Sequence, residues 1–323
     1  MQKLASNSKF INNSFDKTNA FIEKENNLYV IQQCLVPLVE ILVRKNLLKP
    51  KKKQKELHNL LFTILQEYSK YPSIQSRLTH LFKNYRDLNE DDAEKVIACL
   101  GNNADIAHFI IYYTFYRVGR VKEKESFNAD RFTKILKDKI KNGNDGLRRQ
   151  IAWNLWRILD DDLDDNKDKF DKLKEFIDEY VSSTYSKEPF YFILKLIEDH
   201  IDDHYTICKN WLFTIFNGVF EFYKSLDEPK ESNYVIPFEI RLSNILEVVV
   251  KHSSNDYIQI VSNICELAQL ENVVLYDIKR VFEVYKLLPP EKREEILPEL
   301  ELLWDSLVQK NARLIEVDWK TDT

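Results

Sequence analysis

Three residues with metal-binding side chains recur at four-residue spacing in the second half of the chain. On one continuous helix His200, His204 and Cys208 would share a face, and imidazole with thiolate is a ligand set that suits Zn²⁺. Asp202 and Asp203 are typical of a helix start, however, so His200 would end one helix and His204 would begin the next. We keep these three as candidate metal ligands, expect a structural role for them, and predict neither a metal nor a cofactor.

A second cluster consists of carboxylates between two expected helices. Its members are Asp160, Asp161, Asp162, Asp164 and Asp165, and Asp168 and Asp171 continue it. Clustered carboxylates can bind Ca²⁺, but an EF-hand loop also needs a glycine at its sixth position, which no register supplies. Acids near a helix N-terminus are also favoured by the helix dipole. A solvated acidic turn, a docking site for a basic partner and a cation site all stay open.

The opposite charge gathers nearer the N-terminus, with seven positive side chains in twelve residues and no acid among them. They are Arg44, Lys45, Lys49, Lys51, Lys52, Lys53 and Lys55. Such a cluster can bind a phosphate backbone, because each phosphate that lysine or arginine contacts releases condensed counterions. The segment 49–53 also resembles a short nuclear-import signal. A third interpretation is a solvated loop between helices.

An aromatic run, Tyr112, Tyr113, Phe115 and Tyr116, precedes Arg117 and Arg120. Aromatic rings beside arginines can stack on bases. Four rings within five positions cannot share one helix face, however, so we expect a central, packed helix. His108 on that helix is expected to be a core histidine rather than a catalytic base.

Several kinds of catalytic chemistry lack the residues they need. The chain has only 5 glycines, and no phosphate-binding loop can be built from them. No serine lies in a nucleophile elbow, and the zinc-protease pattern H-E-x-x-H is absent. We therefore predict a protein that is not an enzyme. A metal-dependent enzyme with a helical active site near His200–Cys208 or the acidic cluster is the alternative.

Composition points to a soluble cytoplasmic protein. The net charge is −5 and the pI about 5.8, which argues against a generally basic surface. Cys34, Cys99, Cys208 and Cys265 are far apart and indicate reduced thiols rather than disulfides. The N-terminus lacks the apolar core of a signal peptide, and the apolar stretch 109–116 is far short of the ~20 residues that span a bilayer. We expect no membrane partner.

These residues would be positioned by helices, because apolar residues recur at three- and four-residue spacing almost throughout. About 14 helices are predicted, over residues 26–46, 54–70, 72–84, 89–101, 105–116, 128–141, 147–159, 167–182, 189–201, 203–226, 238–252, 256–270, 273–288 and 290–310. Short links make neighbours antiparallel, which predicts helical pairs repeating about every 40 to 47 residues. The fold class is all-α: an α-solenoid or an irregular helical-repeat bundle.

One segment adds a resemblance to this period. Residues 145–155, from Asp145 through Gly146, Arg148 and Ala152 to Leu155, resemble the second-helix entry of a HEAT repeat, although Trp153 and Trp156 are bulkier than the residues HEAT repeats often keep there. The resemblance implies a HEAT-like array over 1–323. A possible seam at 121–128 would separate an N-terminal part, 1–120, from a C-terminal repeat part, 129–323.

The expected function is a non-catalytic scaffold or adaptor that binds a protein partner, because stacked helices form extended contact surfaces. One hypothetical setting is an accessory subunit of a multi-protein complex, such as a bacterial antiviral defence system. The alternative from another class is a nucleic-acid-associated accessory protein that uses the Arg44–Lys55 cluster.

Overall fold

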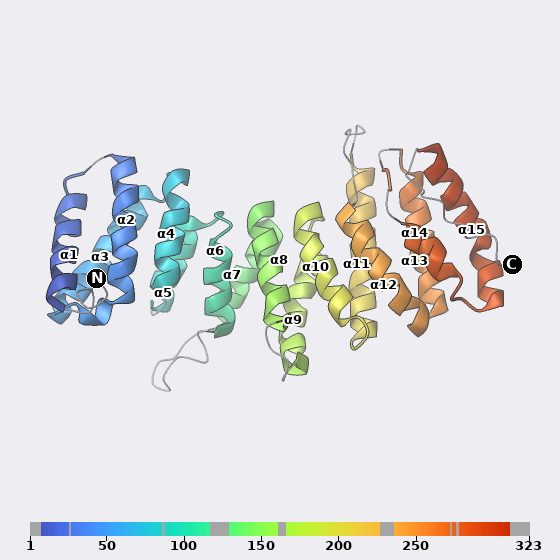
Figure 1. Cartoon of the computed structure of the whole chain (residues 1–323), viewed down its shortest axis with the longest axis horizontal. Helices are drawn as coiled ribbons and strands as arrows, with labels where there is room; N and C mark the ends of the chain where they lie inside the picture. Colours follow the sequence, from blue (N-terminus) through green and yellow to red (C-terminus); the bar gives the residue numbers. More distant parts are fainter. Residues whose placement is uncertain are drawn as a thin grey trace. The chain divides into compact units, whose positions relative to one another are not determined.

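The structure is a computed structural model that describes residues 8–25, 27–85, 88–116, 129–160, 166–226, 236–271, 273–275 and 278–310. Within these ranges the chain is all-α and contains fifteen α-helices and no strand (Figure 1). The chain forms two compact units, residues 1–139 (unit 1) and 140–323 (unit 2). The predicted seam at 121–128 lies outside the described residues.

Unit 1 consists of two layers of helices, and within each layer a helix packs against the second helix after it in the chain. One layer contains α2 (Leu28–Val43), α4 (Pro72–Asn84) and α6 (Ile106–Ile111), and the other contains α1 (Ser8–Ile22), α3 (Lys51–Tyr68) and α5 (Glu90–Leu100). A 3₁₀ turn, η1 (Lys45–Leu47), precedes α3, and a π-helical turn, η2 (Tyr112–Tyr116), continues α6. Helix α7 (Ala129–Asn142) begins in unit 1 and ends in unit 2.

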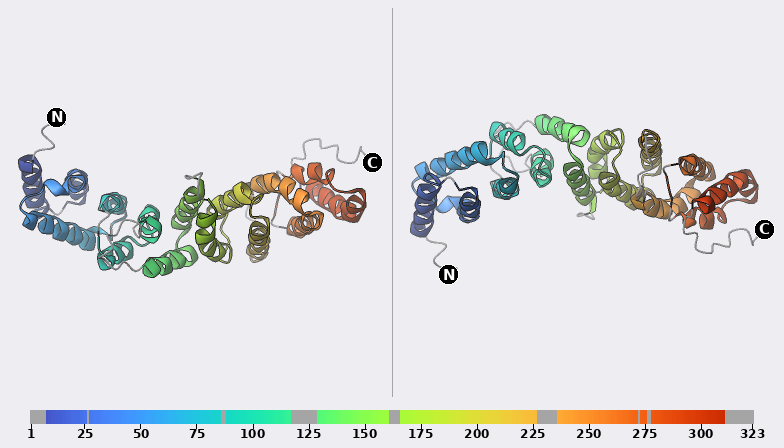
Figure 2. Two further views of the ribbon diagram at one scale, coloured as in Figure 1. Left: turned by 90° about the horizontal axis from the view of Figure 1, so that it is seen from below. Right: turned by 90° about the horizontal axis from the view of Figure 1, so that it is seen from above.

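Unit 2 repeats the same two-layer stacking (Figure 2). The first layer comprises α8 (Asp145–Asp160), α10 (Lys187–His200), α12 (Ile236–His252) and α14 (Lys279–Tyr285), and the second comprises α9 (Asn166–Val181), α11 (Tyr205–Lys224), α13 (Ser254–Gln269) and α15 (Pro290–Gln309). Within the layers of unit 2, successive helices start 36 to 49 residues apart, so their spacing includes the predicted period of 40 to 47 residues but is less regular.

Helix starts follow local sequence signals. The Asn89 side chain accepts a hydrogen bond from the Asp92 N–H at 2.9 Å, and Ser253 caps α13 in the same way. Pro72 and Pro290 occupy the first positions of α4 and α15, where the missing N–H costs nothing. The predicted starts at Asn89, Pro72 and Pro290 are confirmed.

Three local predictions differ from the structure. Helix α1 was not predicted, because asparagine, serine and threonine on its outer side obscure the buried Ile11, Phe15 and Ile22. Helix α14 begins at Lys279 instead of near 273. Helix α3 begins at Lys51 instead of near 54, so Lys51, Lys52 and Lys53 of the basic cluster belong to the helix.

No helix among the described residues combines the length and apolar character needed to cross a lipid bilayer.

Candidate functional site

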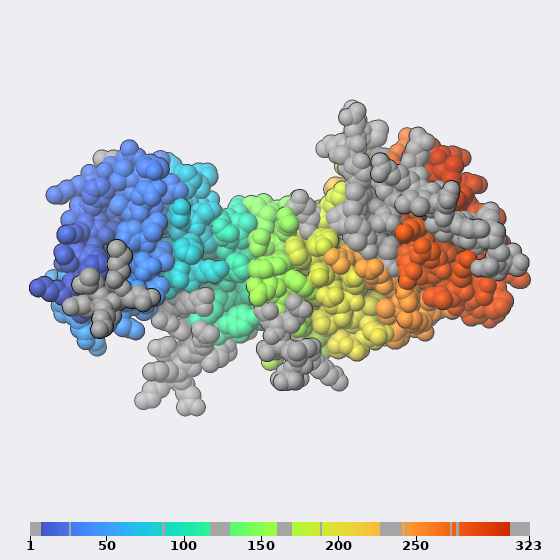
Figure 3. All heavy atoms as spheres, in the orientation of Figure 1, coloured from blue at the N-terminus to red at the C-terminus, as the bar shows by residue number. Residues whose placement is uncertain are grey.

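The basic cluster lies where α2 gives way to α3 in unit 1. Arg44 ends α2, Lys45 opens η1, Lys49 lies in the connection, and Lys51, Lys52, Lys53 and Lys55 occupy the first two turns of α3. In the space-filling view, α1 to α3 form the continuous blue surface at the N-terminal end of unit 1 (Figure 3). The structure thus presents the cluster on one connection and one helix start.

Helix α1 holds this connection in place. The Asn12 side chain donates to the Lys49 carbonyl at 2.6 Å and accepts from the Lys49 N–H at 3.1 Å. The Ser8 hydroxyl donates to the Leu47 carbonyl at 2.6 Å, and the Leu48 side chain is fully buried. The backbone that carries the lysines is therefore fixed, although α1 was absent from the sequence prediction.

Some of the charges have partners from outside the cluster. Arg44 lies 3.6 Å from Glu40, Lys52 lies 3.9 Å from Glu56, and Lys53 forms an ion pair with Asp16 of α1. In each pair at least one side chain is open to solvent, since Glu40, Lys52 and Asp16 are 66%, 82% and 55% exposed, so each pair contributes little to stability. Lys49, Lys51 and Lys55 are exposed and have no ion-pair partner among the described residues.

The first turn of α3 carries an unfavourable charge pattern. Lys51, Lys52 and Lys53 occupy it without an acidic residue, and Pro50 before it makes no side-chain cap. A helix N-terminus bears a partial positive charge, so each cation there costs roughly 0.3–1 kcal/mol at low salt. A bound anion would remove that cost.

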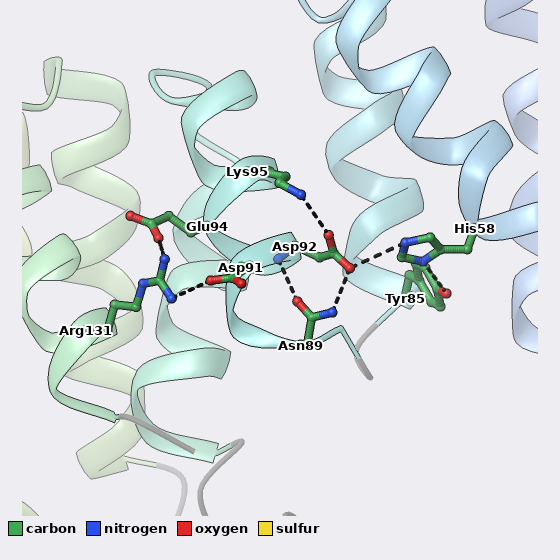
Figure 4. A network of polar contacts seen from close by, with 8 residues as sticks. All are labelled: His58, Tyr85, Asn89, Asp91, Asp92, Glu94, Lys95 and Arg131. Carbon is green, nitrogen blue, oxygen red and sulfur yellow. Dashed lines mark hydrogen bonds and ion pairs between the residues drawn. The ribbon is translucent and has the colours of Figure 1, made fainter. Parts of the chain in front are cut away.

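A polar network begins at His58, two turns further along α3, and joins it to residues of neighbouring helices (Figure 4). His58 Nδ1 lies 3.0 Å from the Tyr85 hydroxyl, and His58 Nε2 lies 3.4 Å from the Asp92 carboxylate. Asp92 also accepts a hydrogen bond from the Asn89 amide at 2.9 Å and lies 3.4 Å from Lys95. The Lys45 ammonium lies 5.0 Å from the centre of the Tyr85 ring, so the basic cluster touches this network.

Arg131 extends the network to α7. It donates to Asp91 at 2.8 Å and pairs with Glu94, both on α5 (Figure 4). The hydrogen bonds to Asp91 and Glu94 raise the pKa of the guanidinium above its usual range. The start of α7 is thereby tied to the same acidic turn that holds His58, so α3, α5 and α7 share one set of polar contacts.

The order Tyr85 hydroxyl, His58 imidazole, Asp92 carboxylate is that of a nucleophile, a base and an orienting acid. Such a row can relay a proton. Neither of two hollows on the described surface is lined by these three residues. These three residues were not predicted as a site, because they are spread over 35 residues and form no sequence motif.

The two hollows lie elsewhere, one in each unit. A hollow of about 510 Å³ in unit 1 is lined by Lys17, Ala20, Phe21, Lys24 and Glu25 at the end of α1. The other, about 350 Å³ between α9 and α11, includes Trp211, whose indole N–H donates to Asp178 at 2.6 Å. Both are open surface depressions next to charged side chains.

The candidate metal ligands do not converge. His200 ends α10, His204 precedes α11 and stacks on Phe170 with ring centres 3.8 Å apart, and Cys208 is fully buried. Burial raises the pKa of the Cys208 thiol to about 12, so it is a poor source of thiolate. The described residues contain no group of three His, Cys, Asp or Glu side chains that could hold a metal ion.

Other candidate residues are placed only in part. Asp161, Asp162, Asp164 and Asp165 lie outside the described residues, and Asp160 is the last residue of α8. Of the aromatic run, Tyr113 is fully buried and Tyr116 is 47% exposed, whereas Arg117 and Arg120 lie outside the described residues. Most of the helix is packed, because seven of the residues 106–116 are buried, and only a narrow strip that includes Tyr112 and Tyr116 is partly exposed. His108 is half-buried.

The net charge of −5 conceals a division between the units. Residues 1–139 carry 24 lysines and arginines against 16 aspartates and glutamates, a net charge of +8. Residues 140–323 carry 23 against 36, a net charge of −13. Composition alone could not show this, because the opposite charges cancel until the unit boundary is known.

Comparison with known proteins adds no relative. No protein-family profile matches the chain, and no curated protein matches it.

Proposed function

We propose that this protein is a non-catalytic helical adaptor that holds a protein partner on unit 1. The observation that supports the proposal is a row of exposed apolar side chains on α2. Tyr29, Val36 and Val43 are 68%, 48% and 64% exposed, although side chains of these types are usually covered. Phe10 and Phe21 on α1 are also about half exposed, at 47% and 49%.

The spacing of the α2 row suits a partner helix. Tyr29, Val36 and Val43 are seven residues apart, nearly two helical turns, so they form one stripe about 21 Å long. Apolar residues at every seventh position form the seam of paired helices, where side chains of one helix insert between those of the other. A stripe left in water costs free energy that a docked helix would recover.

Site-specific photo-cross-linking in cells that produce the protein tests this proposal. A benzophenone amino acid at Val36 or Val43 should form a discrete adduct with a partner protein, identified by mass spectrometry. The same group at the exposed Glu266 of α13 is the control and should not form that adduct. A Val36→Glu, Val43→Glu variant should lose the adduct that a cross-linker at Tyr29 forms. Identical adducts at Glu266, or none from α2, would contradict the proposal.

A further inference from the structure

The basic cluster, Arg44 to Lys55, is separate in kind from the apolar α2 stripe. Between residues 44 and 55 none of the side chains is an exposed large hydrophobic, and Leu48 is fully buried. Protein interfaces have an apolar centre, and membrane-bound helices insert apolar side chains between lipids. The exposed Val43 of the α2 stripe adjoins the cluster, but within residues 44–55 the exposed side chains apart from Pro50 are cationic or polar, which suits a partner recognised mainly by charge.

Going beyond the proposed protein partner, we propose that the basic cluster of unit 1 binds the phosphate backbone of a nucleic acid. The net charge of +8 on unit 1 would attract a polyanion. Lys49, Lys51 and Lys55 supply exposed ammonium groups without ion-pair partners in the described part of the chain. The contacts need no base-specific side chain, so binding should be independent of sequence.

The arrangement of α3 supports this occupant. Lys51 and Lys55 are one turn apart on the same side of the helix, about 6 Å along its axis. Lys52 lies beside Lys51, and its side chain is 82% exposed. Phosphates near the helix start would also be attracted by the positive end of the helix dipole. The lysines of that turn are repelled by the same end, and a bound phosphate would offset this repulsion.

The cluster is also held rigidly, which lowers the entropy lost on binding. The Lys53 ion pair with Asp16 and the two Asn12 hydrogen bonds to Lys49 attach the connection to α1. On the other side, His58 attaches α3 to Asp92 of α5. We therefore assign Lys53 and His58 positioning roles and Lys49, Lys51, Lys52 and Lys55 the phosphate contacts.

Fluorescence anisotropy with the full chain tests the proposal. The probes are a labelled 20-nucleotide oligo(dT), a labelled 20-base-pair duplex and a labelled polyglutamate peptide, at 50 and 200 mM NaCl. If four lysines each contact one phosphate, the fourfold rise in salt should weaken oligonucleotide binding about 50- to 150-fold. Oligonucleotide binding that is absent at 50 mM NaCl, or is no tighter than polyglutamate binding, overturns the proposal.

A matched pair of variants locates the binding surface. Lys49→Gln, Lys51→Gln, Lys55→Gln should reduce affinity at 50 mM NaCl at least tenfold and lower the salt slope by about 2 to 3. Lys17→Gln, Lys24→Gln, Lys70→Gln removes the same charge from other exposed positions of unit 1 and should change affinity less than threefold. Equal losses in the two variants overturn the assignment to the cluster. The salt dependence of binding is measured on the unaltered chain, so it tests the proposal even if one of the variants fails to fold.

Discussion

Replacing Arg148 with methionine tests how the HEAT-like segment is held together. Arg148 is 4% exposed on α8, and one guanidinium nitrogen donates to the Ser183 hydroxyl at 2.9 Å and to the Thr184 carbonyl at 2.6 Å. Its backbone carbonyl accepts from the Tyr180 hydroxyl at 2.9 Å. The side chain therefore joins the start of α8 to the end of α9.

The expected loss follows from these contacts. A hydrogen bond from a charged group contributes about 1.5–3 kcal/mol net. The two acceptors share one nitrogen, and the buried Nε of Arg148 has no partner in the described part of the chain, so the gain is at the low end. We expect Arg148→Met to destabilise the α8–α9 pair by about 2 kcal/mol, roughly a thirtyfold shift towards the open form. Arg148→Ala should cost about 3 kcal/mol, because packing against the Tyr180 ring is lost as well.

Hydrogen exchange read by mass spectrometry gives the opening free energy of α8 and α9 peptides without assuming that the two units unfold together. Arg157→Met, on the exposed side of the same helix, is the control and should change it by less than about 0.5 kcal/mol. Asp145→Asn should cost less than about 1 kcal/mol, because that ion pair is 3.7 Å long and Asp145 is 66% exposed. If Arg148→Met changes the opening free energy no more than Arg157→Met does, the guanidinium does not hold these helices.

Three further predictions concern unit 2. Burial raises the pKa of Asp256, but hydrogen bonds from Tyr205 and Lys209 outweigh it and leave the pKa below the usual value. The resulting stability is therefore present above about pH 4 and is lost as pH falls through the folded pKa. At pH 7 the Asp256→Asn variant should melt at a lower temperature than the unaltered protein, and its melting temperature should fall less steeply between pH 7 and pH 3. Burial raises the thiol pKa of Cys208 and of Cys265 to about 12, so both should resist a thiol reagent at pH 8 until urea is added, and rapid labelling of either in the folded protein would show that it is accessible. The Tyr257 hydroxyl is buried and donates to the Val281 carbonyl at 2.6 Å, so Tyr257→Phe should lower the unfolding free energy by about 1–2 kcal/mol in urea titration, and an unchanged midpoint would mean that this bond contributes nothing.

Many helices could be predicted from signals between neighbouring residues, whereas helix α1 could not. The helix starts at Asn89, Pro72 and Pro290 depend on residues next to them in the chain, so the local sequence pattern was sufficient to predict them. Helix α1 was missed because most of its surface is polar, and its three buried residues gain their significance only from contact with α2 and α3. When the exposed side of a helix is as polar as a loop, the sequence pattern does not reveal its buried side, and only the tertiary structure shows it.

The candidate site shows the same division. The basic residues at 44–55 are visible as a cluster because they lie within twelve residues of sequence, but only the structure shows that Asp16 and Glu56 pair with two of them while Lys49, Lys51 and Lys55 stay exposed. The four-residue spacing of His200, His204 and Cys208 suggested a shared face of one helix, yet α10 ends at His200 and α11 begins at Tyr205, so no single helix carries all three.

The amino-acid sequence by itself determined that the chain is helical, where most helices begin, and which charged clusters exist, because helix periodicity, capping and charge runs act between neighbours in the chain. The tertiary structure decided that His58 meets Tyr85 and Asp92, that Arg148 joins α8 to α9, and that the positive and negative charges belong to different units. These contacts join residues 27 to 36 positions apart, and the packing of helices alone brings such residues within hydrogen-bond distance.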